Sequence, residues 1–281
     1  MPELPEVETV RRGLNRVTLN QDIRGGQVLL QRSIAYPDSV EDFWQGLTGN
    51  QIGQWRRRGK YLLAQLKTAT GTSAGWLGVH LRMTGQLLWV AIEEPVIKHC
   101  RVRIMLDDRE LRFVDQRTFG RLWWIPPGQK PEMIMTGLNK LGPEPFESEF
   151  SPEYLYQATR HRVRPIKNAL LDQRLVAGVG NIYADEALFI SGIRPDTPSG
   201  RLGQSRLRQL HAAVQQVLQA SIEAGGTTFS DFRDVHGVNG NYGGVAWVYD
   251  RKGEPCRTCA TPIERIKLAG RSSHYCPRCQ R

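Results

Sequence analysis

The segment CRTCATPIERIKLAGRSSHYCPRC, residues 256–279, holds four of the five cysteines in the chain. Cys256 pairs with Cys259 and Cys276 with Cys279, each pair with two residues between its members, and sixteen residues separate the pairs. This spacing is typical of a zinc ribbon, in which four thiolates surround one Zn²⁺ ion. Four protein ligands leave no open position, so we expect one structural ion that folds a hairpin too small for its own core. A redox-active dithiol pair is the alternative.

Two residues complete the interpretation of this segment. Arg271, between the cysteine pairs, is expected at or near the tip of the hairpin, where its guanidinium could reach a phosphate. A solvated surface arginine is the alternative. Cys100 has no partner at ligand spacing, so we expect it to be a small buried hydrophobic residue.

The residues before the cysteines follow helical patterns. One helix is expected from Pro152 with Ser151 as its N-cap, and a long one over 207–218, stopped by the glycines at 225–226. Between them, KNALLDQRLVAGVGNIYADEALF joins two helices through a glycine-containing turn and puts Asn181 at the start of the second. Free amides at a helix start bind phosphate. An ordinary helical hairpin, with Asn181 only a cap, is the alternative.

The first half of the chain has a strand pattern instead. Seven short apolar runs are separated by Gly, Asp-Asp or polar clusters: QVLLQRSI, YLLAQL, GWLGVHL, QLLWVAI, RVRIML, ELRFVD and RLWWIP. Six of the seven tryptophans precede residue 125, which favours an antiparallel two-sheet sandwich with a core of large rings. In front of the strands, Val7, Val10 and Leu14 have the spacing of an amphipathic helix that starts near Pro5.

Composition limits the class of protein. A chain of 281 residues with 40% hydrophobic residues can bury a core and is long enough for two domains. Its net charge of +10 favours a polyanionic partner. There is no apolar run of about 18 residues, and the first residues are acidic and polar, unlike a signal peptide. We therefore expect an intracellular protein.

The N-terminus offers unusual chemistry. Removal of the initiator Met would leave Pro2 as a terminal secondary amine beside Glu3. An α-amine has a pKa near 8 against about 10.4 for lysine, so on the order of a hundred times more of it is neutral and nucleophilic at pH 7. Such an amine can form a Schiff base, and a partly desolvated Glu3 could move protons beside it. Alternatively, Glu3, Glu6 and Glu8 only favour the start of the first helix.

Several motifs together resemble formamidopyrimidine-DNA glycosylase, the bacterial-type family that excises oxidised purines from DNA. They are MPELPEVETVRRGL at the start, HLRMTG, DQRTFG, the block IKNALLDQRLVAGVGNIYADEALFISGIRP, and CRTCATPI with HYCPRCQ at the end. The resemblance runs from residue 2 to residue 281. The opening is more similar to this family than to the sister endonuclease VIII group.

The resemblance implies catalytic roles for four residues and a supporting role for a fifth. Pro2 would attack C1′ of the damaged nucleotide, and Glu3 would protonate the opening sugar. Lys60 would be the proton donor in the first elimination, and Arg271 would assist the second and hold the adjacent phosphate. Glu6 would support the N-terminal turn. Without the resemblance, Lys60 would be taken for a surface residue beside a run of arginines.

The resemblance also implies how DNA is held. DNA contacts are expected at His80, His99, Arg117, Arg162 and Asn181. Met83, Arg117 and Phe119 would fill the space left by the extruded base, because apolar wedges and an arginine offset lost stacking and pairing. Core packing is the alternative for Met83 and Phe119.

The implied architecture is α+β. An N-terminal antiparallel two-sheet β-sandwich with an amphipathic N-terminal helix spans 2–130, and a linker spans 131–150. A helix-two-turn-helix domain follows at 151–229, then a flexible lesion-recognition loop at 230–244 and a four-cysteine zinc finger at 245–281. The loop matches the family poorly, so the damage preference stays open.

The implied function is a bifunctional glycosylase and abasic-site lyase of base excision repair. It would remove 8-oxoguanine and formamidopyrimidines from duplex DNA, act on abasic sites, and proceed by β,δ-elimination. One structural Zn²⁺ is the expected cofactor, and the expected state is a monomer in the cytoplasm at the nucleoid, away from membranes. The alternatives are an endonuclease VIII-type enzyme for oxidised pyrimidines and a DNA-binding homologue without catalysis.

Overall fold

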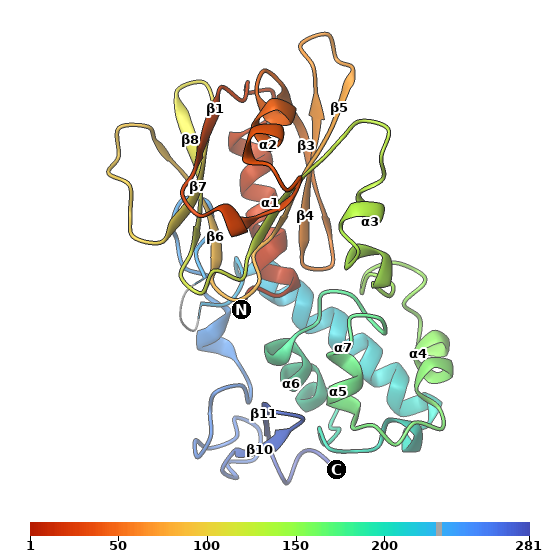
Figure 1. Ribbon diagram of the computed structural model, residues 1–281. Helices are drawn as coiled ribbons and strands as arrows, with labels where there is room; N and C mark the ends of the chain where they lie inside the picture. Colours follow the sequence, from red (N-terminus) through yellow and green to blue (C-terminus); the bar gives the residue numbers. More distant parts are fainter. Residues whose placement is uncertain (229–231) are drawn as a thin grey trace. The chain divides into compact units, whose positions relative to one another are not determined.

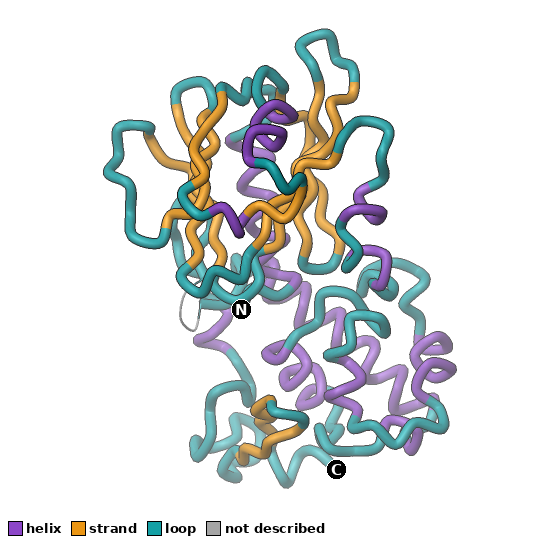
Figure 2. Tube along the Cα trace, in the orientation of Figure 1, coloured by secondary structure: helices purple, strands orange, loops and turns teal. Residues whose placement is uncertain are grey.

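The computed structural model describes residues 1–228 and 232–281, and the chain forms two compact units. The N-terminal unit comprises Met1–Asn139 and Ala224–Asn241, and the C-terminal unit comprises Lys140–Glu223 and Tyr242–Arg281. Strands predominate in the first unit and helices in the second (Figure 2). The chain therefore returns to the N-terminal unit for a short segment after residue 223. The domain boundaries expected from the sequence divide the chain more finely than these two units, and they stay predictions.

The N-terminal unit begins with helix α1, Leu4–Val17, as the apolar spacing predicts. Glu3 is its N-cap and Pro5 lies in its first turn, where the missing amide costs no hydrogen bond. Val7, Val10 and Leu14 are completely buried in the core. Their burial fixes the apolar face of α1 against β3 (Gln51–Arg58) and β4 (Tyr61–Lys67) (Figure 1).

Two sheets form the sandwich (Figure 1). The four-stranded sheet has the order β1 (Gly25–Val28), β7 (Cys100–Met105), β8 (Arg109–Asp115) and β6 (Gly85–Ala91), all antiparallel. The five-stranded sheet has the order β2 (Ile34–Tyr36), β9 (Arg121–Ile125), β5 (Ser73–His80), β4 and β3. All of its pairs are antiparallel except β2 with β9, which is parallel. The two-sheet sandwich is confirmed.

Three details differ from the sequence interpretation. The run at 27–34 is not one strand, because the chain leaves β1, passes a 3₁₀ turn (Gln31–Ser33) and enters the other sheet as β2. Strand β3 was not predicted, since a register shift between Ile52 and Gln54 interrupts its alternation and three arginines end it. Helix α2, Val40–Leu47, was also missed, although Ser39 accepts a hydrogen bond from the Asp42 amide as its N-cap.

The sandwich core is less aromatic than expected. Trp55 and Trp89 are buried, but Trp44, Trp76 and the pair at 123–124 are only half-buried. Valine, leucine and isoleucine side chains from both sheets and from α1 make up most of the interior. Cys100 is buried as predicted, and burial raises the pKa of its thiol.

The remaining helices and strands lie mainly in the C-terminal unit. They are α4 (Pro152–Thr159), α5 (Ile166–Leu170), α6 (Asn181–Ile190), α7 (Gln204–Glu223), β10 (Glu264–Leu268) and β11 (Arg271–Tyr275), with 3₁₀ turns at Ser199–Arg201 and Tyr242–Val245. Helix α3 (Pro131–Ile134) belongs to the N-terminal unit, and a 3₁₀ turn at Leu138–Lys140 lies where the chain passes from that unit to the C-terminal one. Helix α6 packs on α7 and on β11. In the described part of the chain, no helix is long and apolar enough to cross a bilayer.

Candidate active site and DNA-contacting residues

The first turn of α1 is buried and tightly hydrogen-bonded. Pro2 is buried, and Glu3 and Glu6 are only 2% and 1% exposed. The Glu3 amide donates to Glu6 Oε2 at 2.8 Å, and the Glu3 side chain accepts from the Glu6 amide, which makes a capping box. Glu6 Oε1 accepts from the amide of Thr227 at 2.8 Å. The carboxylate of Glu6 therefore joins the N-terminal turn to the segment that follows α7.

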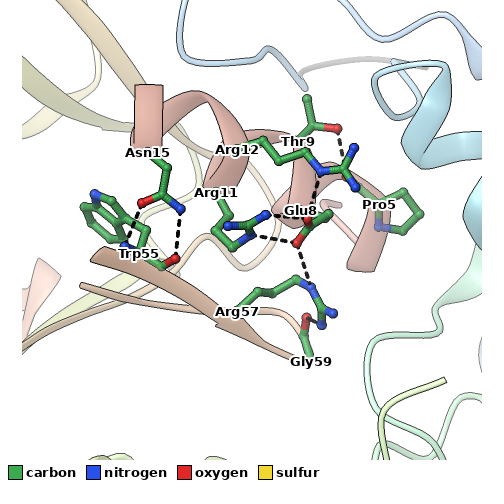
Figure 3. A network of polar contacts seen from close by, with 9 residues as sticks. All are labelled: Pro5, Glu8, Thr9, Arg11, Arg12, Asn15, Trp55, Arg57 and Gly59. Atoms are coloured by element: carbon green, nitrogen blue, oxygen red, sulfur yellow. Dashed lines mark hydrogen bonds and ion pairs between the residues drawn. The ribbon is translucent and has the colours of Figure 1, made fainter. Parts of the chain in front are cut away.

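The β3–β4 turn, which contains Lys60, is linked to the same helix through Arg57. Figure 3 shows Arg57 between α1 and this turn: its Nε lies 3.3 Å from Glu8 Oε2, and its Nη1 donates to the carbonyl oxygen of Gly59 at 3.1 Å. Lys60 follows Gly59 and is only 8% exposed. A buried lysine is not the surface residue that its basic neighbours suggested.

Glu8 holds this arrangement through three arginines (Figure 3). Arg11 and Arg12 both donate to it from later in α1, at 2.8 and 2.9 Å. Burial alone would raise the pKa of Glu8, but hydrogen bonds from Arg11 and Arg12 and the charge of Arg57 outweigh burial and lower it. Glu8 therefore stays ionised and keeps Arg57 on the turn that precedes Lys60.

His80, at the end of β5, is a buried and neutral imidazole. Its ring packs edge-on against Tyr61, with centroids 4.3 Å apart, and its Nδ1 accepts from the amide of Arg82 at 3.0 Å. Burial, reinforced by the positive charges of Arg82 and Lys60, lowers the pKa of His80 to about 3. With Nδ1 as acceptor, the proton of the neutral ring resides on Nε2, which can donate to a phosphate.

The three residues expected to fill the base void lie on two loops. Met83 is half-buried between β5 and β6, and Arg117 and Phe119 are exposed between β8 and β9. The Arg117 guanidinium lies over the Phe119 ring, 5.1 Å from its centroid. Phe119 is 48% exposed, so it is not part of the buried core. His99 precedes β7, and its Nδ1 lies 3.0 Å from Arg101 Nη2.

The C-terminal unit places Asn181 as the first residue of α6, after a turn that ends at the N-cap residue Gly180. Gln173 organises this turn: its side chain donates to the carbonyl of Val179 at 2.8 Å and accepts from the amide of Gly178 at 2.9 Å. Asn181 Oδ1 is buried and has no hydrogen-bond partner among the described residues. Asn181 thus lies at a helix N-terminus, the kind of position at which proteins bind phosphate.

Arg162 lies on the exposed α4–α5 connection. Its carbonyl accepts from the amide of Gly200 at 2.8 Å. It lines a cavity of about 520 Å³ with Arg164 and Arg174. Asp172 partly neutralises this group, since it lies 2.8 Å from Arg164 Nη1. The local charge is still positive and suits an anionic backbone.

Arg271 is exposed at the tip of the β10–β11 hairpin, directly after Gly270, whose φ is +81°. Beneath the tip, Lys167 Nζ donates to the carbonyl of Ser272 at 2.5 Å and forms a 2.7 Å ion pair with Asp185 Oδ1. Asp185 Oδ2 accepts from the amide of His274 at 2.9 Å. Two buried residues of the helices therefore set the position of the hairpin that carries Arg271.

Sequence reasoning missed this anchoring role of α6. Glu186, next to Asp185, accepts from the amides of Trp247, Val248 and Tyr249 at 2.7 to 2.9 Å. Burial raises the pKa of Glu186, although these amides oppose the shift. The available signal was two adjacent acidic residues inside an apolar helix, which nearly always have partners when buried.

The four cysteines form one cluster. Their Sγ atoms all lie within 4.8 Å of one another, with Cys256 to Cys279 at 3.9 Å and Cys259 to Cys276 at 3.5 Å. Zn–S bonds of about 2.3 Å in a tetrahedron place sulfur atoms roughly 3.8 Å apart, so these residues fit a Zn²⁺ ion. The predicted structural zinc is therefore supported by the geometry, and all four ligand positions are taken by protein.

The chain matches one family along most of its length. Residues 1–122 match the formamidopyrimidine-DNA glycosylase N-terminal domain, residues 141–233 the H2TH domain of the same enzyme, and residues 253–281 a zinc finger found in FPG and IleRS. The formamidopyrimidine-DNA glycosylase of Nostoc punctiforme is 64% identical over 281 residues, covering 100% of this chain and 96% of the relative. That of Acaryochloris marina is 62% identical, covering 100% and 99%.

Solved structures agree with these matches. Lactococcus lactis Fpg in complex with abasic-site DNA has a TM-score of 0.89 and 34% identity, with 99% of each chain covered. The same protein with DNA containing N7-benzyl-Fapy-dG has a TM-score of 0.90 at 34% identity, with 100% of each chain covered. A third complex of that protein holds DNA with an oxidised pyrimidine, at a TM-score of 0.89.

A sandwich that begins with a buried Pro-Glu turn, joined to a helix-two-turn-helix unit with a zinc ribbon, defines a DNA glycosylase of base excision repair. The chain belongs to the formamidopyrimidine-DNA glycosylase family, whose members are glycosylases and abasic-site lyases. The resemblance seen in the motifs is confirmed.

Proposed function

We propose that this enzyme removes oxidised purines, 8-oxoguanine and formamidopyrimidines, from duplex DNA and then cleaves the strand at the abasic site. The observation that supports this proposal best is the buried Pro2-Glu3 turn at the start of α1. The positive end of the helix disfavours a second positive charge there, so it favours the neutral amine of Pro2 once Met1 is removed.

In the proposed chemistry, four residues of this chain act one after another. The Pro2 nitrogen forms a bond to C1′ as the glycosidic bond breaks and its electron pair leaves with the damaged base. Glu3 gives a proton to the ring oxygen of the opening sugar, and an iminium forms between Pro2 and C1′. The iminium accepts the electron pair of the C2′–H bond while the C2′ proton passes to water, and the electron pair then expels the 3′ phosphate with Lys60 as proton donor. Arg271 assists departure of the 5′ phosphate.

Side chains from both units would hold the DNA by contacting its sugar-phosphate backbone. His80, His99 and Arg117 would serve the N-terminal unit, and Arg162 and Asn181 the C-terminal unit. Contacts to phosphate release counterions, so binding should weaken steeply as the salt concentration rises.

The segment around 230–244 would recognise the extruded base. Its residues 230 and 231 lie outside the described residues, while Val235 is buried and accepts from the Trp89 amide at 2.8 Å. We place the enzyme in the cytoplasm, at the nucleoid.

Borohydride trapping tests the covalent step. Wild-type protein incubated with 8-oxoguanine duplex and borohydride should give a stable protein–DNA adduct, and intact mass should show loss of Met1. A matched control is the same chain extended by an N-terminal tag, in which the Pro2 nitrogen is an amide. The tagged chain should unfold at the same temperature and trap nothing. Equal trapping by both chains would exclude Pro2 as the nucleophile.

A comparison of lesions tests the substrate class. Single-turnover excision should be at least tenfold faster on 8-oxoguanine than on thymine glycol. The reverse order would favour an endonuclease VIII-type activity, and binding alone does not discriminate, because the Lactococcus lactis relative has been captured with an oxidised pyrimidine. Specific binding without excision of either lesion would favour a non-catalytic DNA-binding protein.

A further inference from the structure

Asp115, at the end of β8, has no role in the chemistry above but contacts every loop of the sandwich that carries a proposed DNA-contacting residue. Its side chain is 1% exposed. Oδ1 accepts from Thr84 Oγ1 at 2.5 Å, and Oδ2 accepts from the amide of Gly120 at 2.7 Å. Thr84 follows Met83 directly, and Gly120 follows Phe119. One buried carboxylate thus joins the two loops that carry the base-void residues.

Thr84 links Asp115 to Arg117 through two hydrogen bonds. Its hydroxyl donates to Asp115 and accepts from the backbone amide of Arg117 at 3.0 Å. A hydroxyl can do both at once, whereas a methyl group can do neither. The positions of Met83 and Arg117 are therefore coupled through a single oxygen atom.

The loop of His99 is joined to the same residue through the backbone. The Asp115 amide donates to the carbonyl of His99 at 3.0 Å, and the Asp115 carbonyl accepts from Arg101 Nε at 2.8 Å. Arg101 Nη2 in turn lies 3.0 Å from His99 Nδ1. All polar groups of Asp115 are thus used to hold three loops at one end of the sandwich.

The backbone of these loops is held in an unfavourable conformation. Arg82, His99 and Thr118 have φ values of +57°, +69° and +58°, in the left-handed region that non-glycine residues rarely adopt. Such conformations persist only where surrounding contacts enforce them. Position 120 requires a glycine, because a Cβ there would lie 2.4 Å from Phe113 Cζ and 3.1 Å from Asp115 Oδ2. Asp115 contacts His99 directly through the carbonyl oxygen of His99, and it hydrogen-bonds to Thr84 and Gly120 in the loops that contain Arg82 and Thr118.

We propose that Asp115, acting through Thr84, is a positioning residue that makes Met83, Arg117 and Phe119 enter the duplex as one rigid group. This inference rests on the proposed function. Void filling offsets the stacking and pairing lost on extrusion, so loose loops should slow extrusion of a paired base. An abasic nucleotide has no base to unstack, so its cleavage should depend much less on these loops.

The test compares two substrates and four variants. Thr84→Val keeps the shape of the side chain and removes the hydroxyl, and Asp115→Asn leaves one acceptor oxygen where there were two. Both should slow excision of 8-oxoguanine at least tenfold, while cleavage of a duplex with a preformed abasic site stays within threefold of wild type. Thr84→Ser retains the hydroxyl and should restore excision to within threefold. A 2-aminopurine placed beside the lesion should show a slower rise in fluorescence on stopped-flow mixing with Thr84→Val.

Thr18→Val provides the matched control for a general loss of stability. Thr18 is fully buried in the same unit, where its hydroxyl accepts from Trp55 Nε1 at 2.9 Å and donates to the carbonyl of Leu14. This variant should be less stable but keep the wild-type fluorescence phase. Equal slowing on both substrates, no slowing by Thr84→Val, or the same fluorescence change in Thr18→Val would overturn the proposal. Absence of abasic-site cleavage by wild type would instead contradict the proposed function.

Discussion

The backbone amide of Thr227 donates to Glu6 Oε1 at 2.8 Å, across 221 residues of sequence. The other oxygen of the same carboxylate accepts from the amide of Glu3 at 2.8 Å. Because a carboxylate offers two acceptor oxygens, Glu6 can hold both segments at the same time. The turn that presents Pro2 is thereby fixed to the segment after α7, close to where residues 230–244 begin.

Glu6→Gln should loosen this connection, because an amide side chain accepts through only one oxygen. We expect single-turnover excision about tenfold slower, with a loss of roughly 1–3 kcal/mol in the free energy of unfolding. Rapid quench and urea denaturation measure the two quantities. Glu41→Gln, at an exposed position in the first turn of α2, should change neither. A wild-type excision rate in Glu6→Gln would show that the link has no bearing on catalysis.

His80 should make the enzyme acid-sensitive. Its pKa is about 3 in the folded state and near 6.5 in the unfolded state, so unfolded chains take up a proton that folded chains do not. Stability is therefore complete above pH 6.5 and falls as the pH drops toward 3, by about 2 kcal/mol between pH 6.5 and 5. Urea midpoints at pH 7 and pH 5 should differ less for His80→Gln than for wild type. Replacing the exposed His236 by Gln should leave the difference unchanged, and an identical pH dependence in His80→Gln would refute the assignment.

Lys167→Met should destabilise the C-terminal unit strongly. It leaves the buried Asp185 without its ion-pair partner, and removing one member of a buried pair costs about 3–5 kcal/mol. The double change with Asp185→Asn removes the uncompensated charge and should recover part of that loss. Chemical unfolding of both variants, with the exposed Lys140→Met as control, measures the effect. If Lys167→Met lowered the free energy of unfolding no more than Lys140→Met does, the Lys167–Asp185 pair would not contribute to stability.

Phe119→Ala should separate activity from stability. The ring is 48% exposed, so its removal should change the free energy of unfolding by less than about 0.5 kcal/mol. If the ring enters the duplex, excision of 8-oxoguanine should fall at least tenfold. Thermal unfolding and single-turnover rates on the same preparation decide the matter. A large loss of stability with unchanged activity per folded molecule would return Phe119 to a packing role.

Local patterns were sufficient for several elements of the fold. The Ser151-Pro152 start of α4 and the apolar spacing of Val7, Val10 and Leu14 each predicted a helix that the structure contains. Where alternation was broken, prediction failed, as in β3 with its register shift at Ile52. Helix and strand signals are carried by neighbours in sequence, so a local irregularity removes them.

The same limit applies to the candidate site. The motifs predicted roles for Met83, Arg117 and Phe119. They predicted none for Thr84 and Asp115, although both residues lie inside the same motifs. Nothing in the sequence indicates that Thr84 and Asp115, 31 residues apart, share a hydrogen bond. Nor does it indicate that a carboxylate in the first turn of α1 receives the amide of Thr227.

The sequence by itself determined the zinc ligands, the Pro2-Glu3 start and the family, because these depend on residue types at short, fixed spacings. Only the tertiary structure decided which buried polar groups hold those residues in place. Folding removes water from groups such as Glu6, Asp115 and Asp185, and each must then find its hydrogen bonds in distant parts of the chain.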